Sequence, residues 1–394
     1  MKRVALGECC EIVSGATPKS AVAEYWGGDI SWATPADLSV LERAYIGSTP
    51  RKLTAAGLAS CSARILPVGS VLLSSRAPIG HVAINTIPMA TNQGFKSLIP
   101  KAGLVDAKYL YHWLSSHKEY LQSLGNGATF KEVSKATVAR VEVPLPSVQE
   151  QRRIAAILDQ ADELRTKRRQ ALAYLNALPQ ALFREMFDDC ASEPVPLAEL
   201  CTRITDGTHQ SPTWAQTGHP FLFVSNIASG EIDLETSKFI SDETHAELTA
   251  RCPIEPGDVL YSTVGSYGVP AVVRTARKFA FQRHIAHLKP HRELIHPEFL
   301  WVQMASPAVR RQADAAARGA AQKTVNLKDI KAFYVIAPPM EQQLRFVVRM
   351  QAIRALGLRA QDGLEALLEL RESLRTSAFT GSLRESADTF NLGI

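Results

Sequence analysis

Two long stretches of the chain carry apolar residues in alternating steps of three and four, which is the spacing of a coiled-coil seam. The first stretch runs from Val148 to about Asp188, and the second runs from about Glu341 to Ser377. In the first stretch the apolar positions are Ile154, Ile157 or Leu158, Ala161, Leu164, Leu172, Leu175, Leu178 and Leu182. In the second they are Phe346, Met350, Ile353, Leu356, Leu364, Leu367, Leu370 and Leu374. A helix of about 40 residues spans about 60 Å, and its single apolar stripe is buried only against another helix, so the pattern predicts that the two helices pair.

Local signals mark where these helices begin and where they are weak. Pro144 and Pro146 stand just before the first stretch, as expected near a helix start. Pro179 lies inside the first stretch. Because proline cannot donate to the helical hydrogen-bond ladder, we expect a kink or a break just before it. Gly357 and Gly363 weaken the second stretch.

The segments outside these stretches mix short strands with short helices. Strands are predicted where short β-rich runs are bounded by glycine and proline, at 70–75, 81–85, 258–264 and 270–274. Residues 109–124 and 297–312 have helical apolar spacing instead. The predicted fold class is therefore α+β.

An internal repeat covers both kinds of segment. GATFKEV at 127–133 aligns with GAAQKTV at 319–325, and PVGSVLLSS at 67–75 aligns with EPGDVLYST at 255–263. The offset drifts between these segments, as small insertions in surface loops allow. The paired positions include Gly127 and Gly319, Lys131 and Lys323, and Gln151 and Gln343. The sequence thus predicts two tandem similar α+β domains, each followed by a long helix.

Antiparallel pairing of the two helices would place the domains at opposite ends of a rod, because each helix follows its own domain. A pseudo two-fold axis would relate the domains, and two DNA readers at a fixed separation would contact a bipartite site with an unread gap. The alternative is that the helices only join the domains or mediate dimerisation.

Composition leaves the partner open. The 394 residues suffice for two or three domains, and 46% apolar with 21% charged residues is typical of globular proteins. A net charge of +5 permits a polyanionic partner without demonstrating one. The six cysteines include no CxxC pair, so we expect reduced thiols and no zinc site. No stretch approaches the roughly 18 uncharged apolar residues of a membrane span, so we expect a cytoplasmic protein.

Several segments together resemble the DNA specificity subunits of type I restriction-modification systems. PLPSVQEQRRIAAILDQADEL at 144–164 is similar to the family's entrance to a long helix, and ITDGTHQSP at 204–212 is similar to the opening of many of its target-recognition domains. Further similar segments are LLSSRAPIGHVAI at 72–84, TNQGFKSLIP at 91–100 and FQRHIAHLKP at 281–290. The resemblance covers essentially the whole chain, although the second helix entrance, PPMEQQLRFVVRM, is a weaker copy and GSYG at 265–268 replaces APIG at 77–80.

The resemblance implies two target-recognition domains that each read half of a split site, and two helices that set the gap and dock methyltransferase subunits. We expect a first target-recognition domain at 1–146, a first spacer helix at 147–189, a second target-recognition domain at 190–338, a second spacer helix at 339–380 and a tail at 381–394. The implied partners are double-stranded DNA, two modification subunits that methylate adenine, and restriction subunits that translocate and cut DNA. S-adenosylmethionine, ATP and magnesium are expected on those partners, and no cofactor is expected on this chain.

Catalytic constellations are missing from the sequence. It contains no GxxxxGK[ST] phosphate-binding loop, no [DN]PP[YFW] motif and no acidic cluster typical of a nuclease metal site. His209 lies close in sequence to Asp206 and Ser211, but this spacing without a nucleophile turn does not indicate a hydrolase. We therefore expect a non-catalytic subunit.

The predicted DNA contacts are polar residues in glycine-containing loops that recur in both halves. Lys131 and Lys323 are candidates for phosphate contacts, with ordinary solvated lysines as the alternative. Arg76 is a candidate for a guanine contact, with a structural salt bridge as the alternative. The remaining candidates are Thr17, Lys19, Ser74, Ser75, Gln93, Lys96, Thr208, His209, Gln210, Ser262, Thr263, Gln282, Arg283 and His284.

The helix seams are expected to bind partner subunits, because they carry more apolar surface than one helix pair covers. The predicted partner-binding residues are Ile154, Ile157, Leu164, Phe346, Met350 and Leu356. A competing hypothesis is a non-catalytic scaffolding protein that presents two protein-binding domains on a helical rod.

Overall fold

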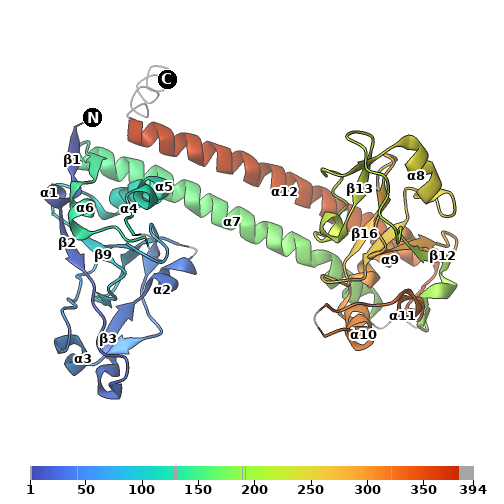
Figure 1. The fold of residues 1–394 in the computed structure, drawn as a ribbon, viewed down its shortest axis with the longest axis horizontal. Coiled ribbons are helices and arrows are strands. Elements are labelled where there is room, and N and C mark those ends of the chain that lie inside the picture. Colours follow the sequence, from blue (N-terminus) through green and yellow to red (C-terminus); the bar gives the residue numbers. More distant parts are fainter. Residues whose placement is uncertain are drawn as a thin grey trace. The chain divides into compact units, whose positions relative to one another are not determined.

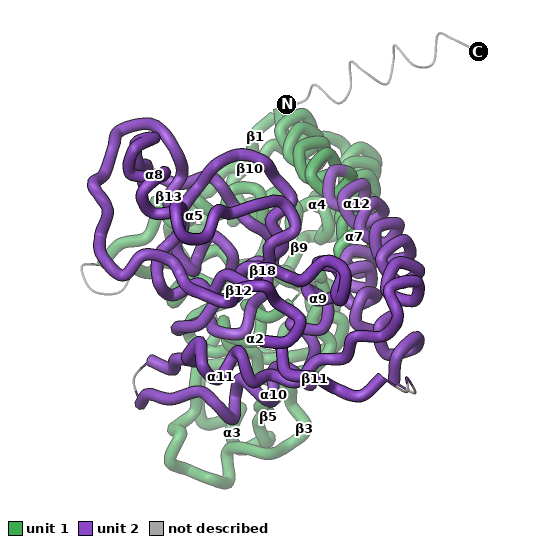
Figure 2. The backbone as a smooth tube through the Cα atoms, turned by 90° about the vertical axis from the view of Figure 1, so that its right-hand side faces the viewer, with its two compact units in different colours: residues 1–169, 363–394 green, residues 170–362 purple. Residues whose placement is uncertain are grey.

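The chain divides into two compact units, which Figure 2 shows in green and purple. Unit 1 comprises residues 1–169 and 363–394, and unit 2 comprises residues 170–362. The computed structural model describes residues 2–380 except 42, 128–130, 189, 191 and 321. The predicted tail at 381–394 lies outside the described residues. The boundary between the units falls within both long helices, so each unit holds a segment of each helix.

Unit 1 is built on a five-stranded sheet. Its strand order is β2 (Cys10–Ser14), β9 (Lys96–Pro100), β6 (Val71–Leu73), β7 (Val82–Asn85) and β4 (Tyr45–Ile46). Smaller sheets pair β3 (Trp26–Ala33) with β5 (Lys52–Leu53) and β8 (Ala90–Thr91), and β1 (Arg3–Ala5) with β10 (Glu142–Pro144). The helices are α1 (Leu6–Cys9), η1 (Ala23–Tyr25), α2 (Pro35–Ser39), α3 (Ala55–Ala59), α4 (Ala107–Ser116), α5 (Lys118–Ser123) and α6 (Lys135–Arg140). Buried residues of α4 and α6 share one hydrophobic core with the five-stranded sheet.

Unit 2 repeats the arrangement with one strand fewer in the main sheet. Its order is β12 (Cys201–Asp206), β18 (Ile285–Pro290), β15 (Val259–Ser262) and β16 (Pro270–Val272). Smaller sheets join β14 (Phe239–Ile240), β13 (His219–Leu222) and β17 (Ala280–Phe281), and β11 (Val195–Pro196) with β19 (Tyr334–Val335). The helices are η2 (Leu197–Glu199), η3 (Val224–Ile227), α8 (Asp242–Thr249), α9 (Pro297–Met304), α10 (Pro307–Ala316) and α11 (Leu327–Lys331). Strand β18 therefore takes the place of β9, and α9 takes the place of α4.

The two long helices are α7 (Val148–Phe187) and α12 (Met340–Thr380), drawn in green and red in Figure 1. In unit 1, Ile154 and Leu158 near the start of α7 pack with Ala378 near the end of α12. In unit 2, Phe187 at the end of α7 packs with Phe346 near the start of α12. The helices are therefore antiparallel within each unit, as predicted.

Pro179 does not break α7, which is a correction to the expected break. The helix is continuous from Val148 to Phe187 with Pro179 inside it. Proline removes one backbone donor from the ladder. The packing of Phe183 and Phe187, which follow Pro179 in the helix, against Phe299 stabilises the turns after the proline.

A buried glutamine connects each α+β domain to its long helix. The side-chain oxygen of Gln151 accepts from the backbone N–H of Asp106 at 2.8 Å, and its nitrogen donates to the carbonyls of Leu104 and Pro146 at 3.0 and 2.9 Å. Gln343 repeats this set in unit 2 with His296, Leu294 and Pro338 at 2.8, 2.9 and 2.7 Å. The repeat therefore extends to the hydrogen bonds that anchor each helix.

Candidate nucleic-acid interface

Three loops converge at the same end of the sheet in each unit. In unit 1, the backbone N–H of Ser75 donates to Gly94 at 2.7 Å, and the N–H of Val133 donates to Ser75 at 2.9 Å. In unit 2, the N–H of Thr263 donates to His284 at 3.0 Å, and the N–H of Val325 donates to Thr263 at 2.9 Å. In each unit, matching backbone hydrogen bonds therefore hold the segment after β6 or β15 between two loops. These loops contain Gly94 and Val133 in unit 1, and His284 and Val325 in unit 2.

A fourth loop joins this cluster from the first strand of each domain. A side chain on Gly15 would collide with the carbonyl of Asn92, and one on Gly207 would collide with that of Phe281, so both loops require glycine at this close approach. In unit 1 this brings the predicted residues Thr17 and Gln93 into hydrogen-bond contact.

In unit 2 the same approach pairs Thr208 with Gln282. The backbone N–H of Arg283 also donates to the carbonyl of Thr208 at 3.0 Å. The loop of Thr208 and the loop of Gln282 and Arg283, predicted as separate candidates, are therefore neighbours.

Unit 2 also has a polar cavity of about 390 Å³ between these loops. Its lining includes Asp206, Thr263, Arg283, His284 and Thr324. Burial and the neighbouring charges of Arg283 and His209 lower the pKa of His284, which favours the neutral imidazole. A neutral imidazole has one donor and one acceptor nitrogen.

The predicted contacts that remain accessible lie in these converging loops. Arg76 is half-buried, while Lys131 and Lys323 are exposed at equivalent places. The other exposed or half-buried candidates are Thr17, Lys19, Gln93, Thr208, His209, Gln210, Gln282, Arg283 and His284.

The side chains of the candidates Ser74, Ser75 and Ser262 are fully buried. The hydroxyl of Ser74 donates to Pro78 at 2.7 Å and accepts from His81 N–H at 2.8 Å. The hydroxyl of Ser262 makes the same two bonds to Ser266 and Val269 at 2.7 and 2.9 Å. Ser74 and Ser262 thus stabilise the turn after the strand in both units.

Thr263 and Lys96 are also largely buried. Thr263 lines the polar cavity, whereas the amine of Lys96 faces Glu132 at 3.0 Å. In this structure the Lys96 amine is therefore used in an ion pair inside the loop cluster. Glu132 was missed by the sequence interpretation, although it follows the candidate Lys131 and replaces Thr324 in the repeat.

The six predicted partner-binding residues differ in exposure. Ile154, Phe346 and Met350 are at most 2% exposed because they pack within the cores of their own units. Leu164 and Leu356 are each 53% exposed, and Ile157 is half-buried. The last three are therefore the accessible ones of this set.

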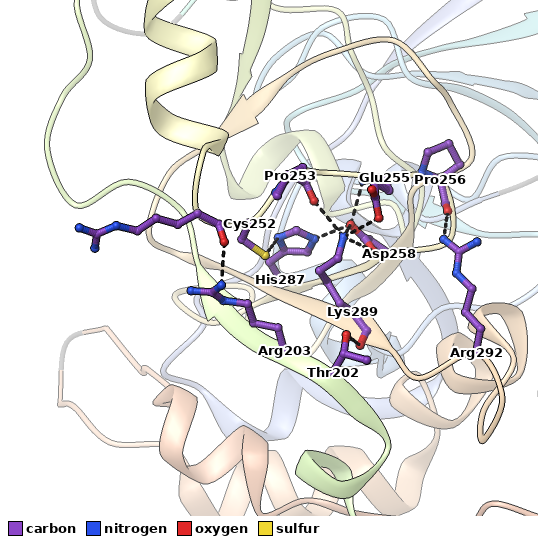
Figure 3. Close-up of polar contacts among 11 residues, drawn as sticks. Thr202, Arg203, Cys252, Pro253, Glu255, Pro256, Asp258, His287, Lys289 and Arg292 are labelled. Carbon is purple, nitrogen blue, oxygen red and sulfur yellow. Dashed lines mark hydrogen bonds and ion pairs between the residues drawn. The ribbon is translucent and has the colours of Figure 1, made fainter.

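The interior of unit 2 holds a polar cluster that sequence spacing did not indicate (Figure 3). His287 lies between Asp258 and Cys252, with Nε2 to Oδ2 at 2.6 Å and Nδ1 to Sγ at 3.4 Å. Lys289 donates to the same carboxylate oxygen at 2.9 Å. His287 and Asp258 are both buried, so this cluster belongs to the core of the unit.

The pKa shifts in the cluster favour charged partners. Burial acts to lower the pKa of His287, but hydrogen bonds with Asp258 and Cys252 outweigh it and the net direction is upward. Burial acts to raise the pKa of Asp258, but the bonds from His287 and from the Glu255 N–H outweigh it and the net direction is downward. Asp258 and His287 therefore form a buried ion pair.

The structure describes residues 2–380 apart from a few positions. That part of the chain has no group of three or more histidine, cysteine, aspartate or glutamate side chains that could hold a metal ion. It also contains no helix that is both long and apolar enough to span a bilayer.

The fold is an internal duplication of one α+β domain. The two domains carry different side chains on equivalent loops. Residues 1–174 match the family described as type I restriction modification DNA specificity domain. Among curated proteins, the MjaIX specificity subunit of Methanocaldococcus jannaschii is 28% identical, over 95% of this chain and 91% of that protein. The EcoKI specificity subunit of Escherichia coli K12 is 23% identical, over 78% of this chain and 73% of that protein.

Solved structures show the same fold. The S subunit of a type I restriction-modification system from M. genitalium has a TM-score of 0.57 and 13% identity, with 96% of each chain covered. A chain from a study of complex assembly in a type I system has a TM-score of 0.62 and 19% identity, with 96% of this chain and 97% of that chain covered. The family match over residues 1–174 and the similarity to curated specificity subunits confirm the predicted resemblance to type I restriction-modification DNA specificity subunits. The comparisons do not favour the scaffolding hypothesis.

Proposed function

We propose that this chain is the non-catalytic DNA specificity subunit of a type I restriction-modification complex. It recognises a bipartite site in double-stranded DNA and directs adenine methylation and restriction by partner subunits in the cytoplasm. The domain limits that we propose are the predicted ones, with target-recognition domains at 1–146 and 190–338 and spacer helices at 147–189 and 339–380.

One observation supports this function best. Both units have the same loop cluster, but they carry different side chains at equivalent positions. The backbone pairs Arg76 with Glu132 in unit 1 and Val264 with Thr324 in unit 2. A constant backbone with variable polar groups is what two readers of different half-sites require, because phosphate contacts position a protein and base contacts specify the sequence. The exposed lysines at 131 and 323 supply the positioning contacts.

Methylation mapping of a host genome tests the function. With the methylating partner present, the chain should direct adenine methylation to a two-part motif separated by a constant unread gap. Deleting the gene should abolish that motif in single-molecule sequencing. An unchanged pattern in the deletion strain, with the partner shown to be active, would refute the assignment.

The partners that we propose are two modification subunits, which carry S-adenosylmethionine, and restriction subunits, which carry ATP and magnesium. Leu164 and Leu356 are exposed apolar residues on the long helices, and we propose them as parts of the surface that binds these subunits.

Leu356→Gln should weaken co-purification of a modification subunit while the chain remains folded. Leu294→Gln is the matched control, because Leu294 is 45% exposed in the same unit but lies outside the helices. Equal recovery of the modification subunit with both variants would remove Leu356 from the partner surface.

A further inference from the structure

Arg76, Lys96 and Glu132 form a charged triad at the loop cluster of unit 1. The Glu132 carboxylate lies 3.0 Å from Lys96 Nζ and 3.6 Å from Arg76 Nη1. The Glu132 backbone is fixed on both sides, because it exchanges two hydrogen bonds of 3.0 Å with Asn126 and pairs with Arg76. Two cations share one carboxylate, so the triad carries excess positive charge.

Unit 2 shows that the fold does not need this triad. Val264 and Thr324 pair where Arg76 and Glu132 pair in unit 1. In β18, Ala286 lies opposite Asp206, as Lys96 in β9 lies opposite Ser14. All three charges are replaced by uncharged residues together, while the backbone hydrogen bonds are kept. The triad therefore serves a purpose specific to the first domain.

The two units also differ in the large polar side chain that lies beside the end of β6 or β15. In unit 1 a Cβ on Gly94 would contact Arg76 Cγ at 3.6 Å, so the arginine stem crosses the bare backbone of that loop. In unit 2 the loop position bonded to Thr263 is His284, and the residue after Thr263 is the short Val264. One end of the domain thus presents an arginine in the first copy and an imidazole in the second.

The ion pair between Arg76 and Glu132 contributes too little to the stability of the fold to explain why an arginine occupies position 76. The two side chains are 35% and 37% exposed, and their closest approach is 3.6 Å. Exposed pairs of this kind contribute little to stability. Lys96, at 10% exposed, is the group that needs the carboxylate as a counter-charge. The Arg76 guanidinium is held near the surface with donors left for a ligand.

We propose that Arg76 reads a guanine in the half-site of the first domain, and that Glu132 is the residue that positions it. An arginine donates two hydrogen bonds to guanine N7 and O6 in the major groove. The Glu132 carboxylate lies beside the guanidinium and leaves most of its five N–H donors for such a base edge. It also neutralises one of the two cations, so the triad attracts phosphate less than two unpaired cations would.

The test uses the full complex and rests on the proposed function. Arg76→Val and Glu132→Gln, singly and together, are compared with wild type by methylation mapping. Arg76→Val should make one G·C position of one half-site degenerate, with a tenfold to hundredfold loss of discrimination, on the order expected for one bidentate contact. Glu132→Gln should relax the same position and add nothing in the Arg76→Val background, because it acts through Arg76.

Two further variants separate this role from a structural one. The triple variant Arg76→Val, Lys96→Ala and Glu132→Thr reproduces the uncharged set of unit 2, so it should fold and show the same relaxed position. Arg64→Val removes an exposed arginine paired with Glu11 in the same unit and should leave the motif unchanged.

The outcomes are distinguishable from failure of the proposed function. Absence of any two-part motif with wild type contradicts the function itself. If wild type has the motif, three results overturn the inference: an unchanged motif with Arg76→Val, relaxation at a position that is not G·C, or an equal loss of methylation at all sites, which indicates a phosphate contact.

Discussion

Asp258→Asn should lower the free energy of unfolding of unit 2 by about 3–5 kcal/mol, because removing one partner of a buried ion pair leaves the other uncompensated. His287 and Lys289 both depend on this carboxylate, at 2.6 and 2.9 Å. Native-state hydrogen exchange of amides in β15 and β18 measures the effect, since a chain with two compact units need not unfold in one step. Asp242→Asn is the control, because that carboxylate bonds His219 at the surface and should not be needed for stability. Similar protection in both variants would show that the buried pair adds little.

The same cluster should make the stability of unit 2 depend on pH. The pKa of His287 is raised, so its contribution is complete below the ordinary histidine value of about 6.5 and is lost as pH rises through the folded pKa. The pKa of Asp258 is lowered, so its contribution is present above about 3.9 and is lost as pH falls through the folded pKa. Protection of β15 and β18 should therefore fall as pH rises above about 6.5 and through the raised pKa of His287, and His287→Gln should flatten that fall.

Gln343→Ala should cost about 3 kcal/mol, because three buried or partly buried hydrogen bonds to the backbone are lost, at roughly 1 kcal/mol or more each. The backbone groups are the N–H of His296 and the carbonyls of Leu294 and Pro338. The amide of His296 should exchange faster with solvent, and the start of α12 should fray. Gln342→Ala, on the exposed side of the same turn, is the matched control. Unchanged protection of His296 would show that the helix is anchored by apolar packing alone.

The helices and the repeat could be predicted because they depend on local spacing. Seam residues at steps of three and four, and two aligned copies of a glycine loop, do not require knowledge of distant contacts. Burial along the seam was less predictable. Phe346 is buried because Phe187 and Phe299 surround it, while Leu356 occupies a seam position and stays exposed. Which seam residues are covered depends on where the domain packs against the helix.

The candidate site was predictable at the level of loops but not of individual side chains. Ser74 and Arg76 are two residues apart in one loop, yet the serine turns inward to close a turn and the arginine stays half-exposed. Residues two apart in a strand point to the same side, but Ser74 and Arg76 lie in the turn after β6, where this alternation does not hold, so the sequence could not say which of them faces a ligand. Glu132 was overlooked because its two cations lie far away along the chain.

By itself the sequence determined two similar α+β domains, two long helices and the loops that carry polar groups, since each of these follows from periodicity or from repetition. Only the tertiary structure decided that Gln151 and Gln343 anchor the helices, that Asp258 and His287 form a buried pair, and that Arg76, Lys96 and Glu132 meet. Hydrogen bonds and ion pairs act over about 3 Å in space and are indifferent to separation along the chain, so they appear only once the chain has folded.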